Sequence, residues 1–224
     1  MRKFYFVLLS IFFGISFIPA ALAHQPRIVY QQQISRTNPV LVKNPEISQA
    51  FYAELRGQPE YYKVVSDRAF NLYVGILSPK IADAKKDFSV EMSGDANDIG
   101  VLNGSHCEWT EFYEPFAGDD YWKGPEFKQN QPGGEYLIKV YNSDNRGKYV
   151  LVVGQAESFP LSESLKLFVS LPKLKHYFGK SGFTAFFNLI GLFLLILLLI
   201  AAIVVFVLIR LFKMIRKKMQ RTPL

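Results

Sequence analysis

The sequence is poor in cysteine and histidine, the residues that most often staple small exported domains or carry out catalysis. Its 224 residues include one cysteine, Cys107, and three histidines, His24, His106 and His176. A single cysteine excludes an internal disulfide bond, so a folded domain of this chain must be held together by its core. A domain of about 150 residues can bury enough surface for that.

Motifs of the common enzyme classes are also absent. The sequence contains no G-x-S-x-G, H-E-x-x-H, P-loop or C-x-x-C pattern. His106 and Cys107 are neighbours, which does not by itself pair a nucleophile with a base. The acids between Glu108 and Asp120 could supply two carboxylates for glycoside hydrolysis, but the sequence does not fix their separation. We therefore expect a non-enzymatic protein.

Acidic residues are missing from both ends of the chain. At the N-terminus, Arg2 and Lys3 precede an apolar run that stops at Ala21-Leu22-Ala23. This order of basic, apolar and small residues is typical of a secretory signal peptide. We predict that residues 1–23 are removed before His24, and an uncleaved N-terminal anchor is the alternative.

Charge disappears altogether from Ser181 to Ile209, a run of 29 residues. A helix needs about 20 apolar residues to cross a bilayer, so we predict a transmembrane helix over residues 183–209. Six basic residues and no acid follow in residues 210–224, and such a flank lies on the cytoplasmic side. The chain is therefore predicted to be a single-pass protein of the cell membrane, with its N-terminal domain extracytoplasmic.

The net charge of +7 comes from these two ends. Residues 24–182 carry 18 Lys and Arg against all 19 Asp and Glu, which leaves a balance of −1. A nucleic-acid surface is strongly basic, so we expect no nucleic-acid partner. The positive charge of the tail fits a topology signal beside the lipid bilayer, and it could also attract anionic headgroups.

Alternation of apolar and polar residues dominates the segment between the two ends. It predicts nine short strands separated by turn residues: 27–31, 39–42, 49–55, 61–65, 70–77, 88–92, 99–102, 136–141 and 149–153. The pattern is typical of an antiparallel β-sandwich or barrel. We predict a mostly β domain over residues 24–157.

The closing hairpin, GGEYLIKVYNSDNRGKYVLVVG, occupies residues 133–154 and is the most regular of these segments. Its alternating glycine, tyrosine and aliphatic residues, together with Tyr61 and Tyr62 in an early strand, resemble the bacterial pre-peptidase C-terminal domain. The resemblance covers about residues 45–154 and implies a small jelly-roll-like β-sandwich. That family usually follows secreted peptidases, and this chain contains no peptidase, so the resemblance implies a fold and no activity.

Residues 158–182 combine an apolar stripe at helix spacing with several lysines. We predict a juxtamembrane amphipathic helix that begins near Pro160 and is interrupted by Pro172. The stripe could lie on the outer leaflet or pack on the sandwich, since both arrangements need the same apolar side chains. The lysines expected to face water or headgroups are Lys173, Lys175 and Lys180.

Two metal sites can be drawn from the sequence. Cleavage would make His24 the N-terminal residue, whose amine and imidazole could bind copper together with His106. Asp95, Asn97 and Gly100 match three positions of a calcium-binding loop, while other positions of the loop do not match. An acidic turn explains the second pattern equally well, so we expect no cofactor, with Ca²⁺ as the alternative.

The densest chemistry lies in residues 108–127, EWTEFYEPFAGDDYWKGPEF, with seven aromatic and six acidic residues. Trp and Tyr faces stack on sugars, and carboxylates accept hydrogen bonds from sugar hydroxyls. The predicted ligand-binding residues are Trp109, Asp119, Asp120, Tyr121 and Trp122. In the alternative, the segment is a loop that packs its own aromatics over the end of the sandwich.

A mixed arrangement would divide this loop between core and surface. Its Phe side chains would point inward, and Tyr121 and Trp122 would stay outside, because the adjacent Asp119 and Asp120 need water. These observations predict a membrane-anchored, non-enzymatic β-sandwich that binds a protein or glycan partner. An accessory subunit of a membrane complex is the runner-up, and a copper or glycan-active enzyme is the third alternative.

Overall fold

A computed structural model of the chain describes residues 24–30, 33–94, 97–114, 118–158, 160–187 and 189–219. The predicted signal peptide and residues 220–224 lie outside the described residues.

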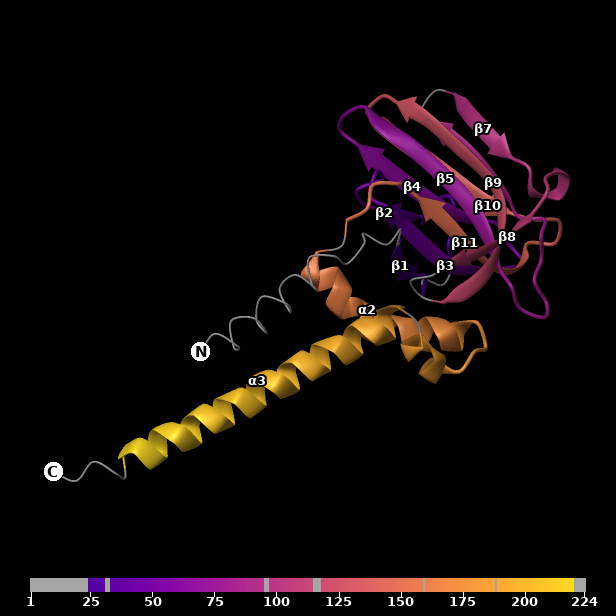
Figure 1. Cartoon of the computed structure of the whole chain (residues 1–224). Helices are drawn as coiled ribbons and strands as arrows, with labels where there is room; N and C mark the ends of the chain where they lie inside the picture. The colour runs from indigo at the N-terminus through magenta and orange to yellow at the C-terminus, as the bar shows by residue number, and fades with distance from the viewer. Residues whose placement is uncertain are drawn as a thin grey trace.

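Two β-sheets stacked face to face form a sandwich at the N-terminal side of the two helices (Figure 1). The six-stranded sheet has the order β1-β3-β11-β5-β9-β8, and the five-stranded sheet has the order β2-β4-β10-β6-β7. The elements are β1 (Gln25–Ile28), β2 (Val40–Val42), β3 (Gln49–Arg56), β4 (Glu60–Ser66), β5 (Phe70–Pro79), β6 (Ser89–Gly94), β7 (Asp98–Leu102), the 3₁₀ turn η1 (Gly104–His106), β8 (Thr110–Glu114), β9 (Asp119–Gln131), β10 (Gly134–Tyr141) and β11 (Arg146–Val153). This arrangement confirms the predicted mostly β sandwich.

The nine predicted strands are all present, but the prediction of a loop over residues 108–127 was wrong. These residues form β8 and most of β9, which pairs with β5. Gly124 and Pro125 suggested a loop, yet both lie inside β9, where the register shifts so that they face the single residue Ile76. A bulge of this kind accommodates a proline within a strand, because the bulged residue donates no ladder hydrogen bond.

The sequence predicted a wholly antiparallel sandwich, but two pairs of strands in the structure are parallel. β1 runs parallel to β3, and β2 runs parallel to β4. Between each of these strands and its parallel partner the chain visits the opposite sheet, so it can re-enter in the same direction. The prediction of an antiparallel sandwich is therefore wrong at this edge of both sheets.

Period-2 alternation places one face of each strand between the two sheets. Ile138 of β10 and Tyr149 of β11 are fully buried there. Val150 and Val152 belong to the opposite face of β11, yet they are also buried, because helix α2 (Leu161–Tyr177) covers that face. This part of β11 is apolar throughout, as expected of a strand that is buried on both faces.

Helix α2 lies on the outer face of the six-stranded sheet, so the apolar stripe of this segment packs on the sandwich. Leu174 and Phe178 contact a cluster that includes Tyr52 and Tyr121 of the sheet. Pro172 lies inside α2 and does not interrupt it, contrary to prediction. The proline ring removes one hydrogen bond of the helix, and Leu171 and Leu174 on either side of it are buried against the sheet.

Helix α3 (Leu189–Met219) follows a short 3₁₀ turn, η2 (Gly182–Phe186), and extends beyond the sandwich as a single helix (Figure 1). Many of its large apolar side chains are exposed, among them Leu192, Leu195, Leu198, Leu199, Phe206 and Phe212. Within the described residues, no helix qualifies as long and apolar enough for a membrane span. The transmembrane helix over residues 183–209 stays a prediction.

Candidate functional site

The five residues predicted to bind a ligand do not form one exposed surface. Trp109, just before β8, is buried between the sheets, and its indole Nε1 donates a hydrogen bond to the Gly104 carbonyl at 2.8 Å. Its ring lies against Gly124 of β9, where a Cβ atom would stand only 2.7 Å from the ring. Trp109 therefore fills the core, and Gly124 leaves the space for it.

Tyr121 and Asp119 lie beneath helix α2, although Tyr121 was predicted to stay outside. Each is only 2% exposed, and the Tyr121 ring meets the Phe178 ring edge-on at a centroid distance of 6.3 Å. Asp119 Oδ1 accepts from Lys175 Nζ at 2.8 Å and from Lys180 Nζ at 2.7 Å. The prediction failed because a distant segment supplies the two cations that a buried carboxylate needs.

Lys175 was expected to face water or headgroups, but its side chain is 2% exposed. Its ammonium also donates to the Gly118 carbonyl at 3.1 Å, between β8 and β9. Asp119, Lys175 and Lys180 together form a buried group that we call the Asp119 ion cluster. It binds the C-terminal part of α2 to the β8–β9 hairpin, while the neighbouring Asp120 is exposed.

Two tyrosine hydroxyls lie close to the Asp119 ion cluster. Burial, followed by the carboxylate of Glu114, raises the pKa of Tyr52. Burial also raises the pKa of Tyr121, and the nearby Tyr52 and Asp119 add to the effect. Both hydroxyls therefore keep their protons at ordinary pH, so neither acts as a base.

Trp122 is partly buried against the inner core, and two lysines cover its ring. Lys86 Nζ lies 4.2 Å from the ring centroid and Lys80 Nζ lies 5.1 Å from it. These are cation–π contacts. Because ammonium groups occupy its face, the ring is not a free platform for a sugar.

The candidate metal ligands are placed separately. His24 Nδ1 contacts Ser48 Oγ, and burial lowers the pKa of this imidazole. His106 is exposed in η1, Asn97 is exposed before β7, and Asp95 lies outside the described residues. In the part of the chain that the structure describes, no three His, Cys, Asp or Glu side chains gather into a metal-binding group.

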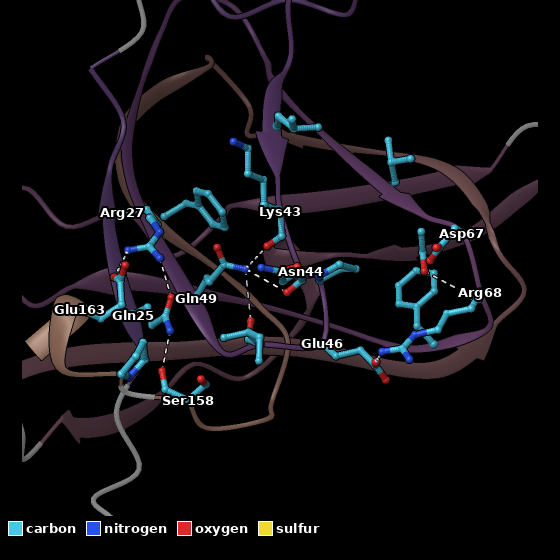
Figure 2. A pocket seen from close by; sticks show the side chains of 18 residues that line it. Gln25, Arg27, Lys43, Asn44, Glu46, Gln49, Asp67, Arg68, Ser158 and Glu163 are labelled. Atoms are coloured by element: carbon cyan, nitrogen blue, oxygen red, sulfur yellow. Dashed lines mark hydrogen bonds and ion pairs between the residues drawn. The ribbon is translucent and has the colours of Figure 1, made fainter.

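A cleft of about 950 Å³ opens at one edge of the sandwich, between the edge strands β1 and β2 (Figure 2). Its walls come from β1, from β2 and the turn after it, from the start of β3, from the end of β4 and the turn after it, and from the start of α2. Its lining includes three cations and three anions: Arg27, Lys43, Arg68, Glu46, Asp67 and Glu163. No sequence motif marks this cleft, because the fold brings its walls together from distant segments.

Some of these polar groups hold the walls of the cleft in place. Arg27 of β1 donates to Glu163 of α2 at 2.8 Å, and the Gln25 amide donates to the Ser158 carbonyl at 2.5 Å. The Gln49 amide binds three carbonyls of the turn before β3, the shortest at 2.8 Å. The edge of the six-stranded sheet and the start of α2 are therefore joined on one side of the cleft (Figure 2).

Other groups are available to a ligand. Within the described residues, neither Lys43 Nζ nor the Asp67 carboxylate makes a hydrogen bond or an ion pair. Leu41 and Val65 at the cleft are 52% and 45% exposed, and Phe70 below them is buried. An apolar floor with a few placed polar groups is typical of a binding site.

The strand edges beside the cleft are poor templates for an added strand. Pro26 of β1 has no N–H, and its carbonyl accepts a hydrogen bond from the Arg27 guanidinium at 3.3 Å. β2 has only three residues. Short or proline-containing edges resist pairing with a further chain, so recognition at the cleft would rest on side chains.

No known protein family matches the chain, and no curated protein is similar to it. Among solved structures, the pre-peptidase C-terminal domain of a collagenase from Bacillus anthracis is similar, at 11% identity and a TM-score of 0.32. The match covers 58% of this chain and 95% of that chain. It is the same family that the closing hairpin resembles. A likeness this distant says nothing about a ligand or an activity.

Proposed function

We propose that this chain is a non-enzymatic, extracytoplasmic binding module whose cleft between β1 and β2 takes a segment of a partner protein. The observation that carries the proposal is the cleft itself. Lys43 and Asp67 present opposite charges with no partner among the described residues, beside the exposed side chains of Leu41 and Val65.

A polypeptide fits this cleft better than a glycan does. Sugar sites usually present the open face of an aromatic ring, whereas Phe51 and Phe70 at the cleft are 3% and 4% exposed. Trp122, the aromatic residue predicted for that role, is covered by lysines. A peptide segment can supply an acid for Lys43, a base for Asp67 and an apolar side chain for the floor.

We further propose that α3 anchors the module in the cell membrane with its C-terminal tail in the cytoplasm. The charge-free run from Ser181 to Ile209 is longer than the 20 or so residues that a bilayer needs. Leu198 and Phe206 are 66% and 61% exposed on α3. Such a helix is stable where lipid or other helices surround it.

A photo-crosslinking residue in the full-length protein, in its native membranes, tests the cleft. It would be placed at Leu41 on β2 or, as a matched control, at Val101 on β7, the opposite edge of the same sheet, which is 59% exposed. We expect a discrete cross-linked protein from position 41 and none from position 101. Lys43→Glu should remove that product, and Lys128→Glu on β9 should not. Equal products from both positions, or no product, would contradict the proposal.

A further inference from the structure

The exposed side of helix α2 carries a small aromatic and basic hollow. Four of its residues and Tyr30, from the segment after β1, enclose about 430 Å³. Tyr30 is 69% exposed, and Lys173 and His176 are also exposed. Pro172 and Tyr177 complete the lining. The hollow thus presents two phenol rings beside an ammonium group and an imidazole.

The chain after α2 folds back onto this same side. Gly182 of η2 packs against Pro172, since a Cβ atom on Gly182 would stand 3.4 Å from the Pro172 carbonyl oxygen. Phe183 and Phe187 at η2 are 70% and 76% exposed, and their ring centroids are 5.5 Å apart. Helix α3 begins at Leu189. The hollow and the two phenylalanines therefore lie together at the place where α3 starts.

We propose that Tyr30, Lys173, His176, Phe183 and Phe187 form a docking surface for the extracytoplasmic headgroup layer of the bilayer. This inference rests on the proposed anchoring by α3. If α3 enters the bilayer near its first residue, the contact between η2 and α2 places the hollow at headgroup depth. Aromatic rings concentrate at this depth, and lipid phosphates attract an ammonium group.

Docking would also set the orientation of the sandwich. The Asp119 ion cluster holds α2 on the outer face of the six-stranded sheet. With the other side of α2 on the bilayer, α2 becomes a layer between sheet and membrane. β7 then lies on the far side of the molecule from the lipid (Figure 1).

Spin labels on the full-length protein in vesicles test the surface. The single native cysteine is removed by Cys107→Ser, and one label at a time is attached through Tyr30→Cys, Phe183→Cys, Leu199→Cys or Val101→Cys. Vesicles of phosphatidylcholine with added phosphatidylglycerol are used. We expect the labels at 30 and 183 to be severalfold less accessible to a water-soluble nickel complex than the label at 101, with the label at 199 the least accessible.

The outcomes separate this inference from the anchoring proposal. A buried label at 199 with a label at 30 as accessible as the one at 101 overturns the docking surface and leaves the anchor standing. An accessible label at 199 overturns the anchor, and the inference with it. Spin–spin broadening at 30 that disappears on dilution with unlabelled protein shows that a second copy covers the surface, which also overturns the inference.

The contribution of Lys173 and His176 to docking is tested by substitution in the same vesicles. Lys173→Ala with His176→Ala should raise the nickel accessibility at position 30, and the change should be larger when phosphatidylglycerol is present. Lys166→Ala serves as the control, because this lysine is on the same helix, is 67% exposed and pairs with Glu163. If the control raises accessibility as much as the double variant does, a headgroup phosphate is not bound there.

Discussion

At the scale of single residues, two acids of the sandwich meet very different surroundings. Asp119 is neutralised by two lysines of the Asp119 ion cluster. Glu60, at the start of β4, instead accepts a hydrogen bond from the Tyr149 hydroxyl at 2.5 Å, and Tyr149 lies 2.7 Å from the Tyr62 hydroxyl. Burial raises the pKa of Glu60 to about 7, from an ordinary value of 4.5, although its bond to Tyr149 opposes the rise.

The raised pKa of Glu60 predicts a stability that falls as pH rises. Because the folded state holds the proton more tightly than the unfolded state, this stabilisation is complete below pH 4.5 and is lost by about pH 7. Glu60→Gln should remove this dependence and stabilise the protein at pH 8, by roughly 1–3 kcal/mol. Urea unfolding at a series of pH values measures the free energy of unfolding of the parent and of Glu60→Gln. Glu108→Gln, at an exposed residue, serves as the control. Parallel pH profiles for parent and Glu60→Gln would show that Glu60 carries no shifted proton.

The Asp119 ion cluster predicts unequal effects for its two lysines. Lys175→Ala removes a buried cation and should lower the free energy of unfolding by about 3–5 kcal/mol, the usual cost of breaking a buried pair. Lys180→Ala, at a side chain that is 31% exposed, should cost about 1 kcal/mol or less. Urea unfolding measures both.

A double variant separates charge pairing from packing in this cluster. In Asp119→Leu with Lys175→Met, the two buried charges are removed together, and Lys180, which also loses its partner, is 31% exposed and can be solvated by water. Much of the loss should therefore be recovered. If the double variant is as unstable as Lys175→Ala, the cluster stabilises by geometry and not by compensating charge.

At the scale of elements, the local sequence pattern located most strands well, but it did not show which elements pack against each other. Alternation located nine strands because period 2 is a property of each segment alone. β8 and β9 were missed because Gly124 and Pro125 look like turn residues, and only the pairing with β5 at Ile76 accommodates them. The apolar stripe of α2 was predicted, but its partner was left open, since a sheet and a bilayer both accept such a stripe.

The β8–β9 hairpin carries its own prediction, on two tyrosines of neighbouring strands. Tyr121 is 2% exposed beneath α2, whereas Tyr113 on β8 is 57% exposed. Tyr121→Ala should lower the free energy of unfolding by about 3–5 kcal/mol, the cost of emptying a buried aromatic site. Tyr113→Ala should change it by about 0.5 kcal/mol or less. Thermal unfolding compares them, and similar losses would mean that Tyr121 is not buried in solution.

At the scale of the whole molecule, the signal peptide and the transmembrane helix stay predictions, and the binding sites left no signal in the sequence. The predicted site failed because Tyr121 and Asp119 are covered by α2, which follows them by some forty residues. The cleft joins residues near β1 and β2 with Ser158 and Glu163 at the far end of the domain. Neither the covering of Tyr121 and Asp119 by α2 nor the assembly of the cleft leaves a motif in the sequence, since both arise from the stacking of distant segments.

Layer stacking also predicts what the sandwich needs in order to fold. Without α2, the outer face of the six-stranded sheet would expose Tyr52, Val150 and Val152, which are at most 6% exposed in the intact protein. A chain that ends at residue 157 should therefore be less stable than one that ends at residue 180. The shorter chain loses three large side chains from the interface, Leu171 and Leu174 of α2 and Phe178 directly after it, which corresponds to a difference on the order of 5 kcal/mol.

Residues 24–180 and 24–157, each produced without α3, would be compared by urea unfolding, by binding of a dye that reports exposed apolar surface, and by sedimentation. The longer chain should be monomeric and bind little dye, because α2 covers the apolar face and the Asp119 ion cluster is complete. The shorter chain should bind dye, unfold at lower urea and self-associate. The urea concentration at which the longer chain unfolds, and the dye that it binds, should take values between those of the two chains when Lys175→Ala is introduced. If residues 24–157 are monomeric and as stable as residues 24–180, the packing of α2 contributes nothing to the sandwich, and α2 is free to leave the sheet.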